Sequence, residues 1–180
     1  MRVTGGRFRG RILHTTPGLT TRPTTDKVRQ SIFNVLMHEL EGAEVLDLFA
    51  GSGALGIDAL SRGAASAVFV ESGFKQVAAI KKNLHTLGLE QKILPVDYCE
   101  ACRLLAAQEK KFTLIFADPP YEEIAPLEVA ETVIQYDLLS SNGLLIIEHK
   151  SGLNVDSDKL TLLKKRKFGQ TEVSFYAAKK

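Results

Sequence analysis

The chain alternates between short apolar runs and longer segments in which apolar residues recur every three to four positions. The short runs are rich in Val, Ile, Leu and Phe, which is typical of buried strands, whereas the longer segments have the spacing of amphipathic helices. The runs lie at residues 44–49, 67–71, 92–97, 112–117 and 143–149. Strands separated by helices form βαβ units, so the pattern predicts a parallel sheet with helices on both faces.

One helical segment precedes the first run and one follows each of the first four. Residues 24–40 carry an apolar stripe, with Thr24 or Thr25 placed to cap the start and Gly42 beyond the end. That stripe consists of Val28, Ile32, Val35 and Leu36. The other helical segments begin near Ala54 or cover residues 74–87, 102–108 and 124–139.

The C-terminal residues depart from this alternation. Residues 159–167 and 171–179 have the character of two strands joined by a tight connection at 168–170, which predicts an antiparallel pair that closes the sheet. We therefore expect an α/β fold: a doubly wound, Rossmann-like sheet that is mostly parallel, with an antiparallel C-terminal strand. The chain has 180 residues, 44% of them apolar, which suffices for one compact domain.

Several kinds of partner are not expected. No run of 18 apolar residues could span a bilayer, and the opening residues lack the apolar segment of a signal peptide. We therefore expect a cytoplasmic protein without a membrane partner. Cys99 and Cys102 form a lone C-x-x-C with no second pair, and the histidines show no ligand spacing, so no metal is expected.

Charge is distributed unevenly, although the net charge is only +2. Residues 1–30 and residues 159–180 carry +6 each, whereas residues 31–158 carry −10. Basic ends around an acidic centre favour a polyanionic partner, because Lys and Arg contacts to phosphate dominate the affinity for nucleic acids. Two solvated basic faces would give the same pattern, so charge alone leaves both interpretations open.

A glycine-rich loop follows the first apolar run. Its sequence, Gly51 to Gly56, is a G-x-G-x-x-G, which is typical of dinucleotide-binding enzymes. Asp47, however, stands four residues before Gly51, close to where a pyrophosphate would lie. Repulsion between the two would cost on the order of 1 to 4 kcal/mol near a protein surface. A ligand with a positive charge fits this loop better than a dinucleotide.

Candidate ligand residues fall where the predicted parallel strands end, which is where doubly wound sheets bind their ligands. Glu71 could accept hydrogen bonds from both hydroxyls of a ribose, Asp97 from the amine of an adenine, and Asp47 from an amino acid ammonium. The residues expected to bind the cofactor are Asp47, Gly51, Ser52, Gly53, Glu71 and Asp97.

The fourth apolar run ends in Asp118-Pro119-Pro120-Tyr121. An aromatic amine is a poor nucleophile because its lone pair is delocalised into the ring. The carboxylate of Asp118 and the carbonyl of Pro119 could accept its two hydrogens, and consecutive prolines would hold the loop rigid. Tyr121 could stack on an unpaired base. Asp118, Pro119 and Tyr121 are therefore the expected catalytic residues, although an ordinary rigid turn would have the same sequence.

These motifs resemble those of a known family. Over nearly all its length, the chain resembles class I S-adenosylmethionine-dependent methyltransferases, and specifically bacterial 16S ribosomal RNA guanine-N2 methyltransferases of the RsmD type. The motifs are GGRFRGR at 5–11, RPTTDKVRQSIFNVL at 22–36, DLFAGSGALGIDALSRGA at 47–64, and DPPY at 118–121. This sequence departs from the family at Gln30, where an acid is usual.

The resemblance implies an enzyme that binds S-adenosyl-L-methionine and methylates the N2 amine of a guanine in 16S ribosomal RNA. Its partner would be that RNA or the small ribosomal subunit, and we expect a monomer. Residues 1–180 would form one methyltransferase domain, with residues 1–41 as an RNA-binding β/α extension and residues 42–180 as the catalytic core.

Five arginines are candidates for contacts with RNA phosphates: Arg7, Arg9, Arg11, Arg22 and Arg29. The first three alternate, so in an extended strand their side chains would share one face. Three other functions remain open for the whole chain: a DNA adenine-N6 or cytosine-N4 methyltransferase, an NAD-dependent oxidoreductase, and an RNA-binding module without activity. Methylation of a protein glutamine is also chemically possible.

Overall fold

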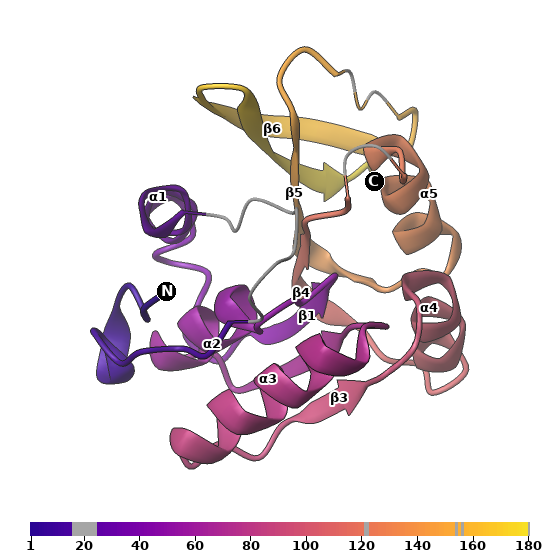
Figure 1. Ribbon diagram of the computed structural model, residues 1–180. Coiled ribbons are helices and arrows are strands. Elements are labelled where there is room, and N and C mark those ends of the chain that lie inside the picture. The colour runs from indigo at the N-terminus through magenta and orange to yellow at the C-terminus, as the bar shows by residue number, and fades with distance from the viewer. Residues whose placement is uncertain (16–24, 121–122, 154, 156, 180) are drawn as a thin grey trace.

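The computed structural model describes residues 1–15, 25–120, 123–153, 155 and 157–179 (Figure 1). Within these residues the strands form one seven-stranded sheet of order β3-β2-β1-β4-β5-β7-β6. They are β1 (Glu44–Leu48), β2 (Ser66–Val70), β3 (Lys92–Leu94), β4 (Phe112–Ala117), β5 (Leu139–Lys150), β6 (Leu160–Phe168) and β7 (Thr171–Ala178). Strands β1 to β5 pair in parallel, whereas β7 is antiparallel to both β5 and β6. The predicted doubly wound sheet is confirmed, including the antiparallel C-terminal pair.

Helices cover both faces of the sheet. They are α1 (Asp26–Val35), α2 (Ala54–Ser61), α3 (Phe74–Thr86), α4 (Tyr98–Ala106) and α5 (Pro126–Gln135). Successive strand residues point to opposite faces, so Val45 of β1 packs with α1, α2 and α3, whereas Leu46 packs with α4 and α5. In Figure 1, α4 and α5 accordingly lie to the right, away from α1 on the left.

Helix α1 begins where the sequence predicts but is shorter than predicted. The hydroxyl of Thr25 caps it by accepting a hydrogen bond of 3.3 Å from the Val28 N–H. The helix ends at Val35, and the following residues form turns in which Leu36 and Leu40 still pack in the core. The apolar periodicity therefore continues past the end of the helix.

Residues 1–15, here named the N-terminal arm, do not form the predicted extended strand. The arm folds back on itself through an isolated antiparallel bridge between Arg2 and Ile12, and residues Gly6–Phe8 form a 3-10 helix. Gly6 has a φ of +73°, and a Cβ there would lie 1.8 Å from the carbonyl oxygen of Ser61. The arm thus turns tightly against the end of α2, which an extended strand could not do.

Hydrogen bonds fasten the arm to α2 from both sides of this turn. The N–H of Thr4 donates to Asp58 Oδ1 at 2.7 Å, and the N–H of Phe8 donates to Ser61 Oγ at 2.9 Å. The Ser61 hydroxyl in turn donates to the Gly5 carbonyl at 2.6 Å. These contacts explain Gly5 and Gly6 of the GGRFRGR motif as a close-packed segment, whereas Gly10 has open space around it and a φ of +84°. Among the described residues, no helix has the length and apolar character to cross a membrane.

Candidate cofactor and substrate site

A cavity of about 420 Å³ lies at the carboxyl ends of the parallel strands. It brings together residues from four separate strand ends, as the doubly wound fold predicts. Six of the predicted cofactor-binding and catalytic residues line it: Asp47, Gly51, Ser52, Glu71, Asp97 and Asp118. Gly53 and Pro119 are buried beside it, and Tyr121 lies outside the described residues.

The glycine loop between β1 and α2 adopts a conformation that other residues rarely reach. Gly51 and Gly53 have φ angles of +56° and +79°, and Gly53 forms the N-cap of α2. Gly56 serves packing instead, because a Cβ there would lie 2.4 Å from the Phe69 ring of β2. The loop therefore exposes backbone groups to the cavity while α2 packs closely on the sheet.

Asp47 is a buried carboxyl group at the end of β1, with 1% of its surface exposed. Its Oδ2 accepts a hydrogen bond of 3.0 Å from the N–H of Gly56 in the first turn of α2. Burial raises the pKa of Asp47 to about 7; the Gly56 hydrogen bond lowers it, and the charge of Glu71 raises it further. A cationic group in the cavity would relieve this unfavourable burial of negative charge.

Glu71 joins the glycine loop to the loop before α3. Its Oε2 accepts from the N–H of Gly51, and its Oε1 accepts from the N–H of Gly73, both at 2.8 Å. These bonds fix the orientation of the carboxylate, and each oxygen retains a further lone pair. The side chain can thus accept hydrogen bonds from two neighbouring hydroxyl groups of a ligand.

Asp97 lies at the start of α4, where its Oδ1 caps the helix by accepting from the Glu100 N–H at 3.0 Å. The next residue, Tyr98, also lines the cavity, and its ring lies 5.0 Å from the ring of Phe49. Phe49 has a φ of +68°, which is strained for a residue with a side chain. Sequence reasoning missed these two aromatic residues, although each closely follows a predicted carboxylate.

The hydroxyl of Tyr98 links the two helices on its face of the sheet. It donates to Glu128 Oε1 of α5 at 2.6 Å. Burial and, after it, this hydrogen bond raise the pKa of Tyr98 above its usual value. Tyr98 therefore remains a neutral donor at physiological pH.

Asp118 directly follows β4 and lines the cavity together with Pro120. The carbonyl of Pro120 accepts hydrogen bonds from the N–H groups of Glu123 and Ile124, at 3.1 and 3.2 Å. Pro120 is thus hydrogen-bonded to residues just ahead of α5. This arrangement holds Asp118 at the same cavity as the three carboxylates from β1, β2 and the start of α4.

Asn83 of α3 connects the glycine loop to the N-terminal arm. Its side-chain nitrogen donates to the carbonyls of Ser52 and His14, at 2.9 and 3.0 Å. Its oxygen accepts from the N–H of His14 at 2.7 Å. One buried amide therefore satisfies three backbone groups from two separate loops.

The five candidate arginines have different environments. Arg7, Arg9 and Arg11 are exposed, and the Arg7 guanidinium lies 4.5 Å from the centre of the Phe8 ring. Arg22 lies outside the described residues.

Arg29 requires a correction, because its side chain is fully buried. It donates to Asp58 at 3.0 Å and to Asp26 at 2.9 Å, so it joins α1 to α2 and is not available to an RNA phosphate. In this structure it connects elements of the fold and also lines the cavity.

Comparisons with known proteins agree with this fold and site. A family model described as conserved hypothetical protein 95 matches residues 1–177. Over 180 residues the chain is 39% identical to YlbH of Bacillus subtilis (strain 168), named as a candidate rRNA methyltransferase, with 98% of each chain covered. It is 34% identical to ribosomal RNA small subunit methyltransferase D of Escherichia coli (strain K12), covering 98% of this chain and 89% of that protein.

A solved structure supports the same relationship. The Escherichia coli protein yhhF, described as a candidate methyltransferase, superposes with a TM-score of 0.86 at 32% sequence identity. The match covers 99% of this chain and 98% of that chain. The likeness therefore extends over the N-terminal arm, the sheet and the C-terminal pair of strands.

Proposed function

Because the chain belongs to the conserved hypothetical protein 95 family, the RsmD-type methyltransferases, we propose that it methylates the N2 amine of a guanine in 16S ribosomal RNA. S-adenosyl-L-methionine is the methyl donor. The observation that carries the proposal is that Asp118 of the DPPY loop lines the same cavity as Asp47, Glu71 and Asp97. The proposed site for the methyl donor and the loop proposed to hold the acceptor base thus line one cavity.

The residues of the cavity fit S-adenosyl-L-methionine better than a dinucleotide. Asp47, buried and adjacent to Glu71, favours the ammonium and disfavours a pyrophosphate. Glu71 would hold the ribose hydroxyls, and Asp97 the adenine amine. Gly51, Ser52 and Gly53 would present backbone groups to the methionine part. When bound, this cofactor supplies an electrophilic methyl group on a sulfonium ion.

The acceptor side uses the DPPY loop. The carboxylate of Asp118 and the carbonyl of Pro119 would accept the two hydrogens of the guanine N2 amine, and Tyr121 would stack on the base. This would orient the nitrogen lone pair toward the methyl group; as the N–C bond formed and the S–C bond broke, S-adenosylhomocysteine would leave and the amine would lose one proton to solvent. Positioning supplies most of the rate, since no covalent enzyme intermediate or metal is needed.

We further propose that two segments of the chain have different functions. Residues 42–180 would form the catalytic core, and residues 1–41 would contact RNA through Arg7, Arg9 and Arg11, within one methyltransferase domain. The substrate would be 16S ribosomal RNA or the small subunit, met by a monomer in the cytoplasm. The names of the relatives in Escherichia coli and Bacillus subtilis support ribosomal RNA as the substrate class.

The test is to incubate the protein and labelled S-adenosyl-L-methionine with small subunits, or their RNA, from a strain lacking the modification. We expect label in one nucleoside, identified by mass spectrometry as N2-methylguanosine. Duplex and single-stranded DNA serve as the control substrates. Label in adenine N6 or cytosine N4 of DNA, with none in RNA, would contradict the proposal.

A further inference from the structure

The edge strand β6 carries four consecutive cations, Lys164, Lys165, Arg166 and Lys167, and all four are exposed. We propose that β6 is a second RNA-binding surface, which holds backbone phosphates of the nucleotides that flank the methylated guanine. This inference rests on the proposed function for the identity of the polyanion. It adds a surface far along the chain from the N-terminal arm.

Strand register places these cations at the same level of the sheet as the start of the acceptor loop. Arg166 pairs with Val173, which pairs with Glu148 of β5. Glu148 follows Ile147, the partner of Ala117, so Arg166 lies at the level of Asp118. Three strand spacings separate β6 from β4, which is about 14 Å. At that distance β6 cannot touch the target base, but it can contact the adjoining backbone.

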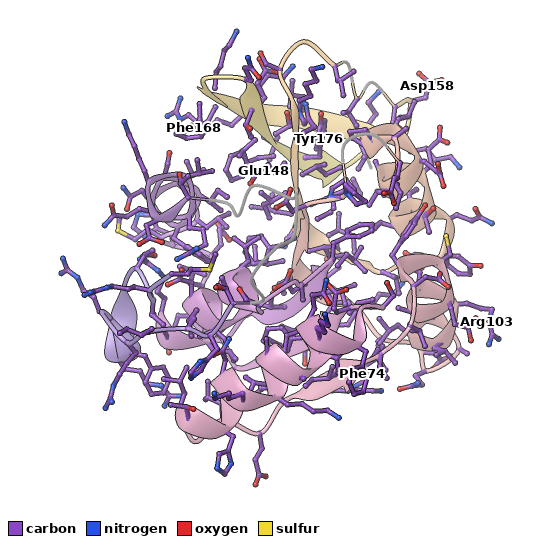
Figure 2. All side chains as sticks on the ribbon, viewed as in Figure 1. Phe74, Arg103, Glu148, Asp158, Phe168 and Tyr176 are labelled. Carbon is purple, nitrogen blue, oxygen red and sulfur yellow. The ribbon has the colours of Figure 1, made fainter. Side chains whose placement is uncertain are left out.

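The four side chains divide between the two faces of the strand. Lys164 and Arg166 lie opposite Phe175 and Val173, whose side chains pack on the face covered by α1. Figure 2 labels Phe168, next along β6, whose ring also packs against that core. Lys165 and Lys167 point to the other face.

Most of the positive charge on this strand is not neutralised by nearby acids. Lys165 lies 3.7 Å from Glu172 of β7. Among the described residues, no carboxylate lies within ion-pair distance of Lys164, Arg166 or Lys167. Since β6 is an edge strand, its outer backbone N–H groups can also donate to phosphate oxygens. A polyanion is thus the partner that matches both sets of groups.

The exposed residues of β6 have two other possible roles, protection of the sheet edge and docking of a protein, and each predicts a different experimental result. Lysines on an edge strand discourage pairing with other sheets, which requires no RNA. Leu162 and Leu163 on the same strand are 45% and 56% exposed, so a ribosomal protein could dock there through apolar contacts. The phosphate interpretation alone predicts that binding to naked RNA depends on these cations and on salt.

The experiment measures binding of the full chain to naked 16S ribosomal RNA at several salt concentrations. The variant replaces Lys164, Arg166 and Lys167 with Gln. If all three contact phosphate, the slope of log K against log salt falls in magnitude by about 2, at roughly 0.7 per contact. The same relation gives a loss of affinity of about 10²-fold at 0.1 M salt. Arg166→Gln alone should lower the slope by about 0.7.

A matched control removes three exposed cations at the amino ends of β3 and β4, at the opposite end of the sheet from the cavity, Lys92, Lys110 and Lys111, also by Gln. We expect the control to keep nearly all of the slope. Equal slopes for wild type, β6 variant and control would overturn the inference in favour of edge protection. A defect on assembled subunits with a normal slope on naked RNA would overturn it in favour of a protein contact.

The same experiment separates this inference from the proposed function. If the wild-type protein binds RNA through β6 but transfers no methyl group, the proposed RNA-binding surface is supported and the proposed methyltransferase function is contradicted. Wild type that binds no RNA would contradict both. If wild type and the β6 variant methylate RNA equally well at all salt concentrations, only the proposed RNA-binding surface on β6 is contradicted.

Discussion

The carboxyl group of Asp47 and the backbone N–H of Gly56 lie 3.0 Å apart, so the end of β1 is hydrogen-bonded to the first turn of α2. This bond holds a buried acid at the wall of the cofactor cavity. Burial nevertheless dominates and raises the pKa of Asp47 to about 7. Cofactor binding should consequently depend on pH near neutrality.

We expect cofactor affinity to fall as the pH drops below about 7. The folded-state pKa of Asp47 is raised above its ordinary value of 3.8, so the empty site gains a proton as the pH falls through 7. A cationic ligand favours the ionised carboxylate and must displace that proton. The dissociation constant should rise by up to about tenfold per pH unit in this range.

Calorimetric titration between pH 6 and 8 checks this pH dependence. Asp47→Asn should bind more weakly above pH 7 and show little dependence on pH. A wild-type dissociation constant that stays constant from pH 6 to 8 would contradict the assignment.

The raised pKa also affects folding in the absence of cofactor. Between the unfolded pKa of 3.8 and the folded pKa of about 7, the folded protein binds more protons at Asp47 than the unfolded chain does. The contribution of Asp47 to the free energy of unfolding is therefore present below pH 3.8 and is lost as the pH rises through 7. Asp47→Asn should thus gain stability relative to wild type at pH 8. Chemical denaturation at pH 6 and pH 8 gives this difference directly.

Replacing Glu71 with Ala should weaken cofactor binding by about tenfold or more, since charge-assisted hydrogen bonds to hydroxyls contribute about 1.5 to 3 kcal/mol. Isothermal titration calorimetry measures the effect. Glu90→Ala, on an exposed residue away from the cavity, is the control. Unchanged affinity in a folded Glu71 variant would exclude this carboxylate from the ribose site.

Asp118→Ala should leave cofactor affinity nearly intact while the single-turnover rate of methylation falls by at least about 10²-fold. The reason is that Asp118 would act on the acceptor amine, whereas Asp47, Glu71 and Asp97 would hold the donor. Rapid-quench assays with saturating RNA measure the rate. Near-normal turnover would show that the DPPY loop has a structural role only.

Arg29→Ala should destabilise the fold by about 3 to 5 kcal/mol, because it leaves the buried Asp58 without its ionic partner. Asp58 retains its hydrogen bonds from Thr4, so the chain should still fold. Urea denaturation measures the loss, and Arg11→Ala, an exposed position, is the control. Equal midpoints for the two variants would refute the connecting role of Arg29.

Replacing Arg7, Arg9 and Arg11 with Ala should reduce the salt slope of RNA binding by about 2 if all three contact phosphate. Cofactor affinity should barely change, because the three side chains are exposed on the arm. Filter binding across a salt series measures the slope. An unaltered slope would indicate that these arginines are merely solvated.

The sequence predicted the cavity well because it follows from topology. Carboxyl ends of parallel strands must meet at one edge of the sheet, so Asp47, Glu71 and Asp118 could be brought together without coordinates. The aromatic neighbours Phe49 and Tyr98 were harder to foresee. Their place in the wall of the cavity depends on the left-handed backbone of Phe49 and on the contact between its ring and that of Tyr98 at the start of α4.

The N-terminal arm was mispredicted for a tertiary reason. The alternation of Arg7, Arg9 and Arg11 is a local signal for a strand, but the turn at Gly6 is imposed by contact with Ser61 of α2. The sequence around Arg29 likewise contains no signal that distinguishes this buried arginine from an exposed one. Its burial depends on Asp58, a residue 29 positions away whose side chain faces α1 only in the folded protein.

Asn83 implies that the arm and the core cannot be separated by simple truncation. If the chain began at residue 42, the loss of His14 would leave the side-chain oxygen of this buried amide without its donor. The bond to Ser52 would then have to hold the amide alone, so the amide would hold the glycine loop less firmly. The proposed division at residue 41 would thus distinguish two tasks of one folding unit, and a shortened catalytic fragment would carry a weakened cofactor loop.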